Sequence, residues 1–359
     1  MKKEVVLSYF PQMTYRRYTQ LSASFFTLES TFLATHNQLR AIGWNASTIE
    51  AWFQWKPTVS LSHISQELAL YGITPIALGD DQYPVLLSTI TDPPICLFVR
   101  GNTFFSTKTV GVVGTRKNTS YGKQVTEQLV GDIATRGVHV ISGLALGIDA
   151  IAHNACLRSG GITVAVLAGG IDAHTVAPRA HYQLSEEIIT KGGSIVSEYP
   201  PLVQPTIYSF PKRNRIIAGL SRGTVVIEAP KKSGSLITAD CALQYNREVM
   251  VVPQNITSPT AQGTNDLLKQ GAHPITSYTD ILEILQLQDL EDSATTPKKY
   301  PSSQHERDLL SLLSTEPTHI DELIRMSTLS NTVIMSTLML MEMNGFVKHI
   351  GGMKYVIRY

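Results

Sequence analysis

Cysteine is scarce in this chain of 359 residues. The three cysteines, Cys96, Cys156 and Cys241, lie far apart and form no Cys-X-X-Cys pair. This spacing argues against a disulfide scaffold and against a zinc ribbon. Net charge is also small, since the formal value is +1 at pH 7. If the chain binds nucleic acid, its cations must therefore be gathered locally.

Long apolar runs are lacking as well. The most apolar stretch, Ile162 to Ile171, is too short and too rich in glycine to span a bilayer, which takes about 20 apolar residues. The N-terminal segment MKKEVVLSYFPQM has no small-residue cleavage site, so we expect no signal peptide. A composition of 43% hydrophobic and 16% charged residues is typical of a globular protein. We therefore expect a cytoplasmic protein without membrane contact.

The first part of the sequence, residues 1–72, predicts a small helical domain of the SAM or helix-hairpin-helix kind. Its apolar residues recur at helical spacing, and Gly43 separates two helical patterns. Asn45 or Ser47 is suited to cap the second helix. The glycine turn of such a helix pair can hold a phosphate, but few cations flank this one, which favours plain packing. Prolines 75, 84, 93 and 94 exclude a long helix from the segment that follows.

Residues 73–285 predict an α/β core. Short strands alternate with helical patterns, and the strands are TVGVVG, VHVIS, ITVAVL, SIVSE, GTVVIEA and EVMVV. Each is almost wholly apolar, as expected when helices cover both faces of a sheet. The alternation predicts a doubly wound, mostly parallel sheet. Residues 286–304 are polar and proline-containing, which predicts a linker. Residues 305–359 show three helical patterns and two short strands about a Gly–Gly turn, which predicts a winged helix.

Cations gather in the loops that follow the predicted parallel strands. The carboxyl ends of such strands share one edge, where ligands bind. Four of these loops contain glycines, which let backbone N–H groups approach an anion. The loops hold Arg116 and Lys117, then Lys212, Arg213 and Arg215, then Lys231 and Lys232. Tyr208 and Phe210 lie beside the densest cation group. Cations that follow phosphates and rings that stack on bases, at ~1–3 kcal/mol per base, suit single-stranded nucleic acid.

The glycine pattern does not favour a dinucleotide-dependent oxidoreductase. Gly111 and Gly114 lack the third glycine of the fingerprint, and the second strand ends in Ser142 and Gly143 without a carboxylate for a ribose. Ser233 and Ser235 could act as nucleophiles, but no base lies nearby in the sequence. Contact with phosphate or backbone is the simpler role for them.

Carboxylates near the strand ends raise the question of catalysis. Asp149 and His153 are four residues apart on one helix face, as a base and its orienting partner would be. A hydrogen bond that braces a loop is the favoured interpretation. Asp172, Glu198 and Glu228 also follow strands. His174 and His181 have no partner at metal-ligand spacing, so we expect no metal.

Eight motifs resemble those of the DNA-processing protein DprA (Smf) family from about residue 5 onward. They are, in order, VVGTRKNTSYG, ISGLALGIDAIAH, AVLAGGID, SEYP, FPKRNRIIAGLS, VVIEA, SGSLITA and QGTNDLLKQGA. The resemblance implies an extended Rossmann-like core, a helical N-terminal domain and a winged helix. It also implies a protein without enzymatic activity or cofactor, which binds and protects single-stranded DNA and helps to load the RecA recombinase during natural transformation. Self-association through the core, as a homodimer, is implied too.

The resemblance also implies which residues contact DNA. It assigns Arg116 and the segment from Phe210 to Arg215 to the DNA pocket, with Asn214 bracing the loop. Together with the residue analysis, the predicted DNA-binding set is Gly114, Arg116, Lys117, Ser142, Gly143, Phe210, Lys212, Arg213, Asn214, Arg215, Ser233 and Ser235. Two positions depart from the family pattern. Leu146 stands where an arginine is common, and Gln254 stands where a glycine is usual.

The C-terminal module carries little positive charge. Five basic and six acidic residues from His305 onward give it a net charge of −1, and its last helical pattern, NTVIMSTLMLMEMNGF, contains no cation. Since duplex binding depends on Lys and Arg at phosphates, we expect this module to contact protein instead, or to pack as a regulatory appendage. The alternative for the whole chain is an enzyme that binds or hydrolyses nucleotides with Asp149, Glu198 and Glu228.

Overall fold

A computed structural model describes residues 1–288, 303–314, 316–344 and 346–357. The chain divides into two compact units, Met1–Ala294 and Thr295–Tyr359. Most of the predicted linker, residues 289–302, lies outside the described residues. Across the described residues, no helix combines the length and the apolar character that crossing a membrane requires.

The first unit begins with short helices that pack around aromatic side chains. These helices are α1 (Lys3–Leu7), α2 (Tyr15–Ser24), α3 (Leu28–Leu33), α4 (His36–Ala41), α5 (Ala46–Trp55), η1 (Lys56–Thr58) and α6 (Leu61–Leu70). Asn45 caps α5 by accepting a hydrogen bond from the backbone N–H of Thr48 at 2.8 Å, as predicted. Gly43 lies in the turn before α5 and has a φ of 94°, a value that glycine adopts readily. Phe10, Trp44 and Trp52 form the centre of this helical part.

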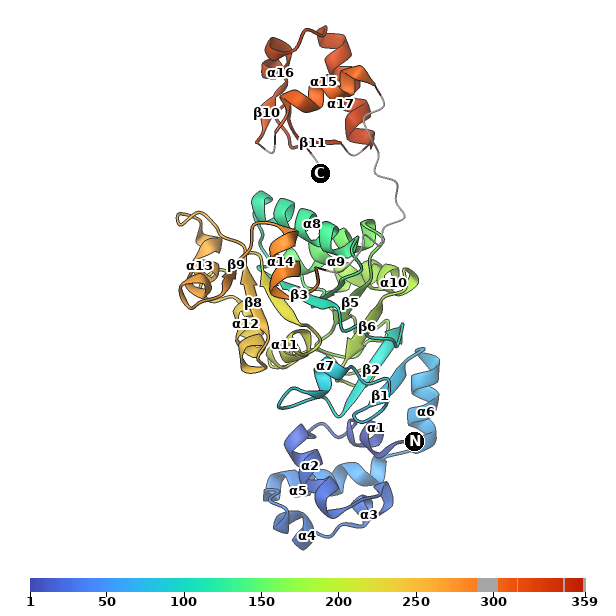
Figure 1. The fold of residues 1–359 in the computed structure, drawn as a ribbon. Coiled ribbons are helices and arrows are strands. Elements are labelled where there is room, and N and C mark those ends of the chain that lie inside the picture. Colours follow the sequence, from blue (N-terminus) through green and yellow to red (C-terminus); the bar gives the residue numbers. More distant parts are fainter. Residues whose placement is uncertain (289–302, 315, 345, 358–359) are drawn as a thin grey trace. The chain divides into compact units, whose positions relative to one another are not determined.

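Within the described residues, nine strands form one sheet in the order β1-β2-β6-β5-β4-β3-β7-β8-β9 (Figure 1). The strands are β1 (Thr74–Ala77), β2 (Cys96–Gly101), β3 (Thr109–Val113), β4 (His139–Ser142), β5 (Thr163–Val166), β6 (Ser194–Ser197), β7 (Gly223–Val226), β8 (Glu248–Val251) and β9 (His273–Pro274). Strands β3 to β9 are parallel to one another, while β1 and β2 add an antiparallel edge beside β6. The predicted doubly wound α/β sheet is confirmed. The antiparallel edge was not predicted.

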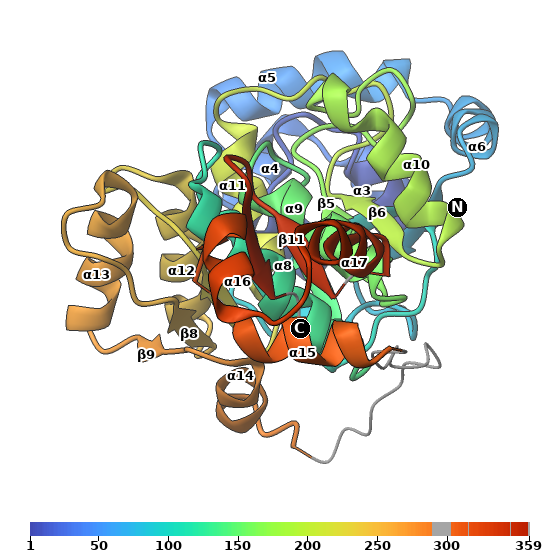
Figure 2. The same ribbon diagram turned by 90° about the horizontal axis from the view of Figure 1, so that it is seen from above.

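Helices cover both faces of the sheet. The helices of the core are α7 (Val85–Ser88), α8 (Ser120–Ala134), α9 (Ile148–Arg158), η2 (Arg179–His181), α10 (Tyr182–Thr190), α11 (Ser209–Gly219), α12 (Gly234–Gln244), η3 (Pro259–Ala261), α13 (Gln262–Lys269) and α14 (Tyr278–Ile284). Alternate side chains of a strand face opposite sides. Val112 therefore packs with α8, α9 and α14, whereas Val113 packs with α11, α12 and α13. Figures 1 and 2 show α12 and α13 beside β8.

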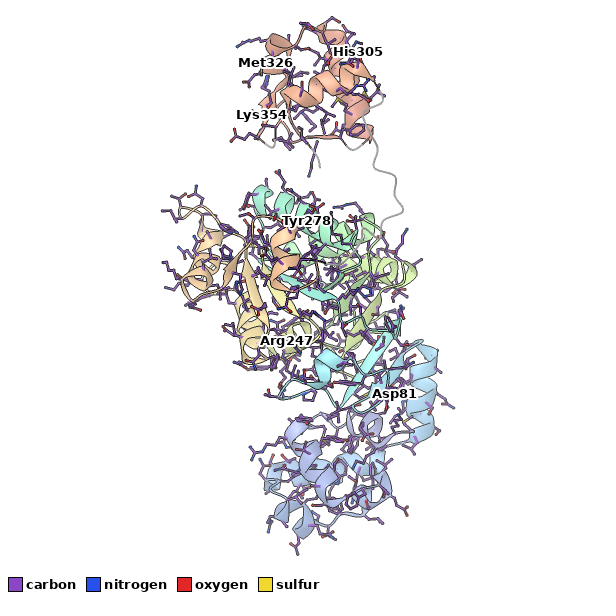
Figure 3. All side chains as sticks on the ribbon, viewed as in Figure 1. Asp81, Arg247, Tyr278, His305, Met326 and Lys354 are labelled. Carbon is purple, nitrogen blue, oxygen red and sulfur yellow. The ribbon has the colours of Figure 1, made fainter. Side chains whose placement is uncertain are left out.

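Two arginines tie the outer helices to the rest of this unit. The guanidinium of Arg136 lies 3.9 Å from the ring centroid of Tyr278 and donates a 3.0 Å hydrogen bond to its hydroxyl. Arg247 donates a hydrogen bond to the carbonyl oxygen of Leu86 at 3.1 Å. Figure 3 labels both Tyr278 and Arg247. These contacts hold α14 to α8, and the chain beyond α12 to α7.

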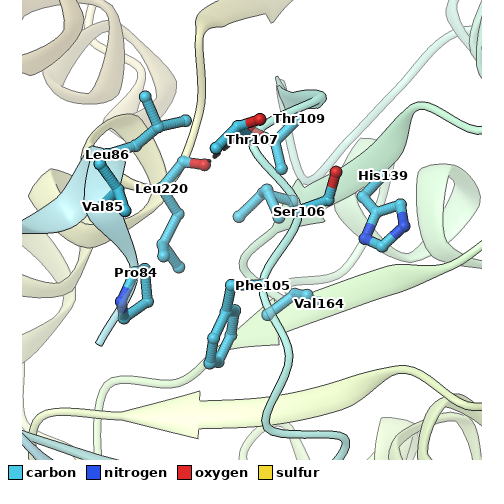
Figure 4. A pocket seen from close by; sticks show the side chains of 11 residues that line it. Pro84, Val85, Leu86, Phe105, Ser106, Thr107, Thr109, His139, Val164 and Leu220 are labelled. Atoms are coloured by element: carbon cyan, nitrogen blue, oxygen red, sulfur yellow. Dashed lines mark hydrogen bonds between the residues drawn. The ribbon is translucent and has the colours of Figure 1, made fainter. Parts of the chain in front are cut away.

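A small cavity lies at the amino ends of β3 and β4, between α7 and the loop before β3 (Figure 4). Its volume is about 10 Å³, which is room for about one water molecule. Leu86, Phe105, His139 and Leu220 are among the residues that line it. This cavity is therefore too small for a ligand larger than water.

The second unit has its own core. Its described residues form α15 (Gln304–Leu312), β10 (Thr318–His319), α16 (Ile320–Met326), α17 (Asn331–Asn344), β11 (Val347–His349) and β12 (Lys354–Ile357). The strands pair in the order β10-β12-β11. Leu309, Leu323, Ile334 and Leu338 are buried at its centre. Three helices and a small sheet are the architecture of a winged helix, which confirms that prediction.

Candidate nucleic-acid interface

The carboxyl ends of the parallel strands form one edge of the sheet, which we call the rim. It consists of the loops that follow β3, β4, β5, β6, β7 and β8 (residues 114–119, 143–147, 167–178, 198–208, 227–233 and 252–258). The chain order turns at β3, because β4, β5 and β6 extend the sheet on one side and β7, β8 and β9 extend it on the other. The loops after β3 and β7 therefore flank the topological switch point, where such sheets bind ligands.

Arg116 and Phe210 meet at the rim although they come from distant parts of the chain. Arg116 lies in the loop after β3, and Phe210 lies in the first turn of α11. The guanidinium carbon of Arg116 is 5.6 Å from the centroid of the Phe210 ring, within the range of a cation–π interaction. The structure thus brings the first cationic loop and the FPKRNR segment to the same place.

Five of the cations named from the sequence are exposed. They are Arg116, Lys117, Lys212, Lys231 and Lys232. In the part of the chain that the structure describes, the side chains of these residues take part in no hydrogen bond and no ion pair. Their charges are therefore available to an anion in solvent.

Arg213 is an internal cation, in contrast to its neighbour Lys212. Only 5% of Arg213 is exposed. Its Nη1 donates hydrogen bonds to the carbonyl oxygens of Gly143, at 2.7 Å, and of Val166, and its Nε donates to Asn214. Burial lowers the pKa of Arg213 to about 10, against the opposing charge of Asp149. Arg213 therefore joins the ends of β4 and β5 to α11, and a direct phosphate contact by it stays a prediction.

Arg215 also makes contacts inside the protein. Its Nη2 pairs with the carboxylate of Glu198, its Nε lies 3.4 Å from Oδ2 of Asp92, and its Nη1 donates to the carbonyl oxygen of Asp92 at 2.6 Å. Cations near a helix N-terminus oppose the helix dipole. The carboxylates of Asp92 and Glu198 offset this charge, which explains why the first half of α11 tolerates an arginine here.

The glycines of the first two rim loops allow these loops to pack closely. Gly147 has a φ of 79°, and a Cβ atom there would lie 2.4 Å from the carbonyl oxygen of Thr115. A Cβ atom on Gly114 would lie 2.6 Å from Ile148. At Gly143, a Cβ atom would lie 2.7 Å from the guanidinium of Arg213. These glycines make room for neighbouring protein groups, and a contact of Gly114 or Gly143 with DNA stays a prediction.

The remaining predicted residues shape the loops. The buried hydroxyl of Ser142 donates to the carbonyl oxygen of Val112 at 2.6 Å. Asn214 donates to the carbonyl oxygen of Gly234 at 3.1 Å, so it braces the loop after β7. Ser233 caps α12 by accepting from the N–H of Ser235 at 3.3 Å.

The acidic side chains near the rim serve as braces for backbone groups. Glu228 is buried and accepts hydrogen bonds from the N–H of Thr119 at 2.8 Å and from its hydroxyl at 2.5 Å. Asp149 accepts from the N–H of Gly143 at 3.1 Å, and burial raises the pKa of this carboxyl group. Asp172 accepts from the N–H groups of His174 and Leu202. The bracing role of Glu228 was missed in the sequence.

His153 does not pair with Asp149. Its Nδ1 lies 2.7 Å from the hydroxyl of Thr163, and burial lowers the pKa of this imidazole to about 3. Within the described residues, no group of three or more His, Cys, Asp or Glu side chains is placed to hold a metal ion.

The two departures from the family pattern take different positions at the rim. Leu146 is 47% exposed. The side-chain amide of Gln254 donates to the carbonyl oxygen of Ile227, which ties the loop after β8 to the end of β7. Exposed apolar side chains that the sequence did not single out, Leu202 and Ile207, lie in the loop before α11 beside Tyr208, which is 75% exposed.

Fold and rim define a Rossmann-like α/β protein with a cationic edge and a winged-helix module. Residues 74–286 match the family model described as DNA recombination-mediator protein A, and residues 293–353 match the DprA winged helix domain. The chain belongs to the DNA recombination-mediator protein A (DprA, Smf) family.

Similar proteins agree with this assignment. Protein Smf of Escherichia coli is 38% identical over 77% of this chain and 75% of its own length. DNA processing protein DprA of Bacillus subtilis is 40% identical over 70% of this chain and 82% of its own length.

Solved structures of this family share the fold. Streptococcus pneumoniae DprA has a TM-score of 0.65 and 32% identity, over 78% of this chain and 95% of its own. The Helicobacter pylori protein, solved for its "unique single-stranded DNA binding mode", has a TM-score of 0.54 and 30% identity, over 60% of this chain and 96% of its own.

Proposed function

We propose that this protein binds single-stranded DNA along the rim with little sequence preference. The observation that carries this proposal is the contact of Arg116 with Phe210, because it joins an exposed cation and an aromatic ring from two distant loops. Phosphates and ring faces carry little sequence information, so binding through them is general. The single-stranded DNA binding of the H. pylori relative supports the same assignment.

The predicted DNA-binding residues divide into two groups in this proposal. Arg116, Lys117 and Lys212 contact phosphates, and Phe210 stacks a base. The others hold the loops in place, namely Gly114, Ser142, Gly143, Arg213, Asn214, Arg215, Ser233 and Ser235. Exposed Lys231 and Lys232 extend the cationic edge beyond the switch point.

The proposed role is non-enzymatic and needs no cofactor. In the alternative of a nucleotide hydrolase, Asp149, Glu198 and Glu228 would perform the chemistry. Each of these carboxylates instead has internal partners: Asp149 and Glu228 accept from backbone N–H groups, and Glu198 pairs with Arg215. Groups engaged in this way are poorly placed to exchange protons with a substrate.

In the cell we propose the role that the family resemblance implies. The protein would act in the cytoplasm, protect incoming single-stranded DNA and assist loading of the RecA recombinase during natural transformation, as a homodimer joined through the core. The winged helix would contact protein rather than duplex DNA. Its α17 contains no cation and exposes Met335, Met339 and Leu340, which suits an apolar partner surface better than a phosphate backbone.

Fluorescence anisotropy of a labelled oligothymidine tests the proposal. Arg116→Ala and Lys212→Glu should each lower affinity about tenfold at low salt, because a charge-assisted contact to phosphate is lost. The slope of log affinity against log salt concentration should fall by about 0.7 for Arg116→Ala. Lys191→Ala removes a cation that is also exposed, at the opposite edge of the sheet, and is the matched control for Arg116→Ala. Unchanged affinity in both rim variants would refute the rim as the binding site.

Nucleoside monophosphates test the enzymatic alternative. Incubation with the protein should release neither base nor phosphate. Turnover that disappears in Glu228→Gln would replace the proposed function by a hydrolytic one.

A further inference from the structure

The helical N-terminal part of the chain contains an open cleft with a volume of about 270 Å³. The residues that line it are Phe10, Pro11, Gln12, Ala51, Gln54 and Trp55. This volume is far larger than that of the one-water cavity beside α7, and it admits a planar ring system. Two of the lining side chains are amides, which both donate and accept hydrogen bonds. We call this depression, lined by the six residues above, the Trp55 cleft.

The aromatic wall of the Trp55 cleft is held rigidly from behind. The indole of Trp55 lies 5.2 Å from the ring of Phe10 and 5.0 Å from that of Trp52, between ring centroids. Phe32 supports it from a third direction at 6.0 Å. Trp44 and Trp52 are buried, whereas Trp55 is half-buried. A ring that enters the cleft therefore meets an aromatic surface that needs no further ordering.

One arginine lies at the margin of the Trp55 cleft. Residues 1–72 contain six basic and four acidic residues, a net charge of +2. Arg17 donates a hydrogen bond to the carbonyl oxygen of Gln12, so its guanidinium lies at the margin of the cleft. Arg16 precedes it on α2 and is exposed.

The acidic residues of this part are mostly engaged elsewhere. Glu4 accepts a hydrogen bond from Tyr18, and Glu67 accepts one from Tyr9. Glu50 accepts from the side-chain amide of Gln54 at 3.2 Å and is the carboxylate that contacts a lining residue. Arg17 thus offers a place for an anionic group of a planar occupant, on the side of the cleft formed by Gln12.

We propose that the Trp55 cleft receives a nucleobase of single-stranded DNA, stacked on Trp55, with a neighbouring phosphate at Arg17. This inference rests on the proposed function and adds a second contact outside the core that binds the strand at the rim. The amides of Gln12 and Gln54 suit the polar edge of any base, so the contact carries little sequence preference. A proline-rich or aromatic peptide would use the ring but not Arg17.

Tryptophan emission is a selective reporter for the Trp55 cleft. All three tryptophans of the chain lie in residues 1–72, and two of them are buried. Unlabelled oligothymidine added to the full chain should quench this emission in parallel with the rise in anisotropy of a labelled strand. Ala51→Phe, which fills the cleft, should abolish the quenching and lower affinity about fivefold, the equivalent of one stacked base at ~1 kcal/mol. Ser47→Phe adds the same ring at an exposed position of α5 and should behave like the parent.

The outcomes separate this inference from the proposed function. Emission that stays constant while anisotropy rises to saturation would overturn the cleft proposal and leave rim binding intact. Quenching that persists in Ala51→Phe would overturn it too. Quenching by a proline-rich peptide but not by oligothymidine would assign the cleft to a protein partner. An anisotropy that never rises would instead contradict the function proposed for the rim.

Discussion

Arg116 lies over the ring of Phe210, with its guanidinium carbon 5.6 Å from the ring centroid. The first residue belongs to the loop after β3 and the second to the start of α11, which follows β6. Between β3 and β6 in the sheet lie β4 and β5. The contact therefore spans the rim across these two strands and unites a cation with a stacking surface.

Replacement of Phe210 by leucine tests the stacking surface. Phe210→Leu keeps an apolar side chain but removes the ring face, which is worth ~1–3 kcal/mol to a stacked base. Affinity for oligothymidine should fall at least fivefold, measured by anisotropy, with little change in thermal stability. Phe104→Leu alters a ring that is 73% exposed at the opposite edge of the sheet and serves as the control. Equal affinities of the two variants would exclude stacking on Phe210.

The same substitution should affect DNA affinity at Lys212 and the free energy of unfolding at Arg213. Lys212→Met should lower DNA affinity about tenfold and leave the free energy of unfolding nearly unchanged, because Lys212 is exposed. Arg213→Met should lower the free energy of unfolding by about 3–5 kcal/mol, since it leaves buried Asp149 without its cation. Urea titration and anisotropy measure the two effects. An Arg213→Met variant that is fully stable but fails to bind DNA would make Arg213 a direct phosphate ligand.

Gly122 should be required because it leaves room for the carboxylate of Glu228. A Cβ atom on Gly122 would lie 2.3 Å from Oε2 of Glu228, the carboxylate that holds Thr119. Gly122→Ala should therefore destabilise the protein by about 1–3 kcal/mol through overpacking, although alanine favours a helix. Gly131→Ala, on the same helix, meets only the hydroxyl of Ser159 at 3.1 Å and should be neutral or stabilising in the same thermal scan. A stabilising Gly122→Ala would show that the loop after β3 does not depend on this contact.

Acid should destabilise the protein through His153. The folded-state pKa of His153 is lowered to about 3 by burial and by the charges of His181 and Arg213. Below a pH of about 6.5 the unfolded chain therefore binds a proton that the folded chain does not bind. The free energy of unfolding should fall by up to ~1.4 kcal/mol per pH unit between about pH 6.5 and 3. The raised pKa of Asp149 acts in the opposite sense, because its folded form holds a proton more readily than its unfolded form.

The histidine contribution is measurable in a variant pair. His153→Gln should flatten the dependence of unfolding free energy on pH between 5 and 6.5, relative to the parent chain. His63→Gln, which changes an exposed histidine, is the control. If both variants follow the parent curve, His153 does not titrate differently in the folded and unfolded chains.

The core strands were predictable because their amino-acid composition reflects their burial. Strands β3 to β8 are buried on both faces, so their sequences are nearly continuous apolar runs. At the β1–β2 edge, β2 begins with four buried apolar residues, Cys96–Val99, but β1 contains Pro75. The prolines of this segment indicate only that a helix is excluded, and β2 pairs with β6, which lies far along the chain. The pairing of two strands so far apart in the chain cannot be inferred from the residues of either strand.

The roles of neighbouring cations were beyond sequence reasoning. Successive residues on a helix point about 100° apart, so Lys212 faces solvent while Arg213 faces the strand ends. The FPKRNR segment looks uniformly cationic until the helix is placed on the sheet. The two internal arginines find carboxylates in Asp149, Glu198 and Asp92, which come from three other segments.

A structure of the full chain with a short oligothymidine is the most direct measurement. The account predicts backbone phosphates within hydrogen-bonding distance of Arg116 and Lys212, and a thymine against Phe210. A strand seated at the amino ends of the parallel strands, or held only by the winged helix, with the rim left empty, would contradict it.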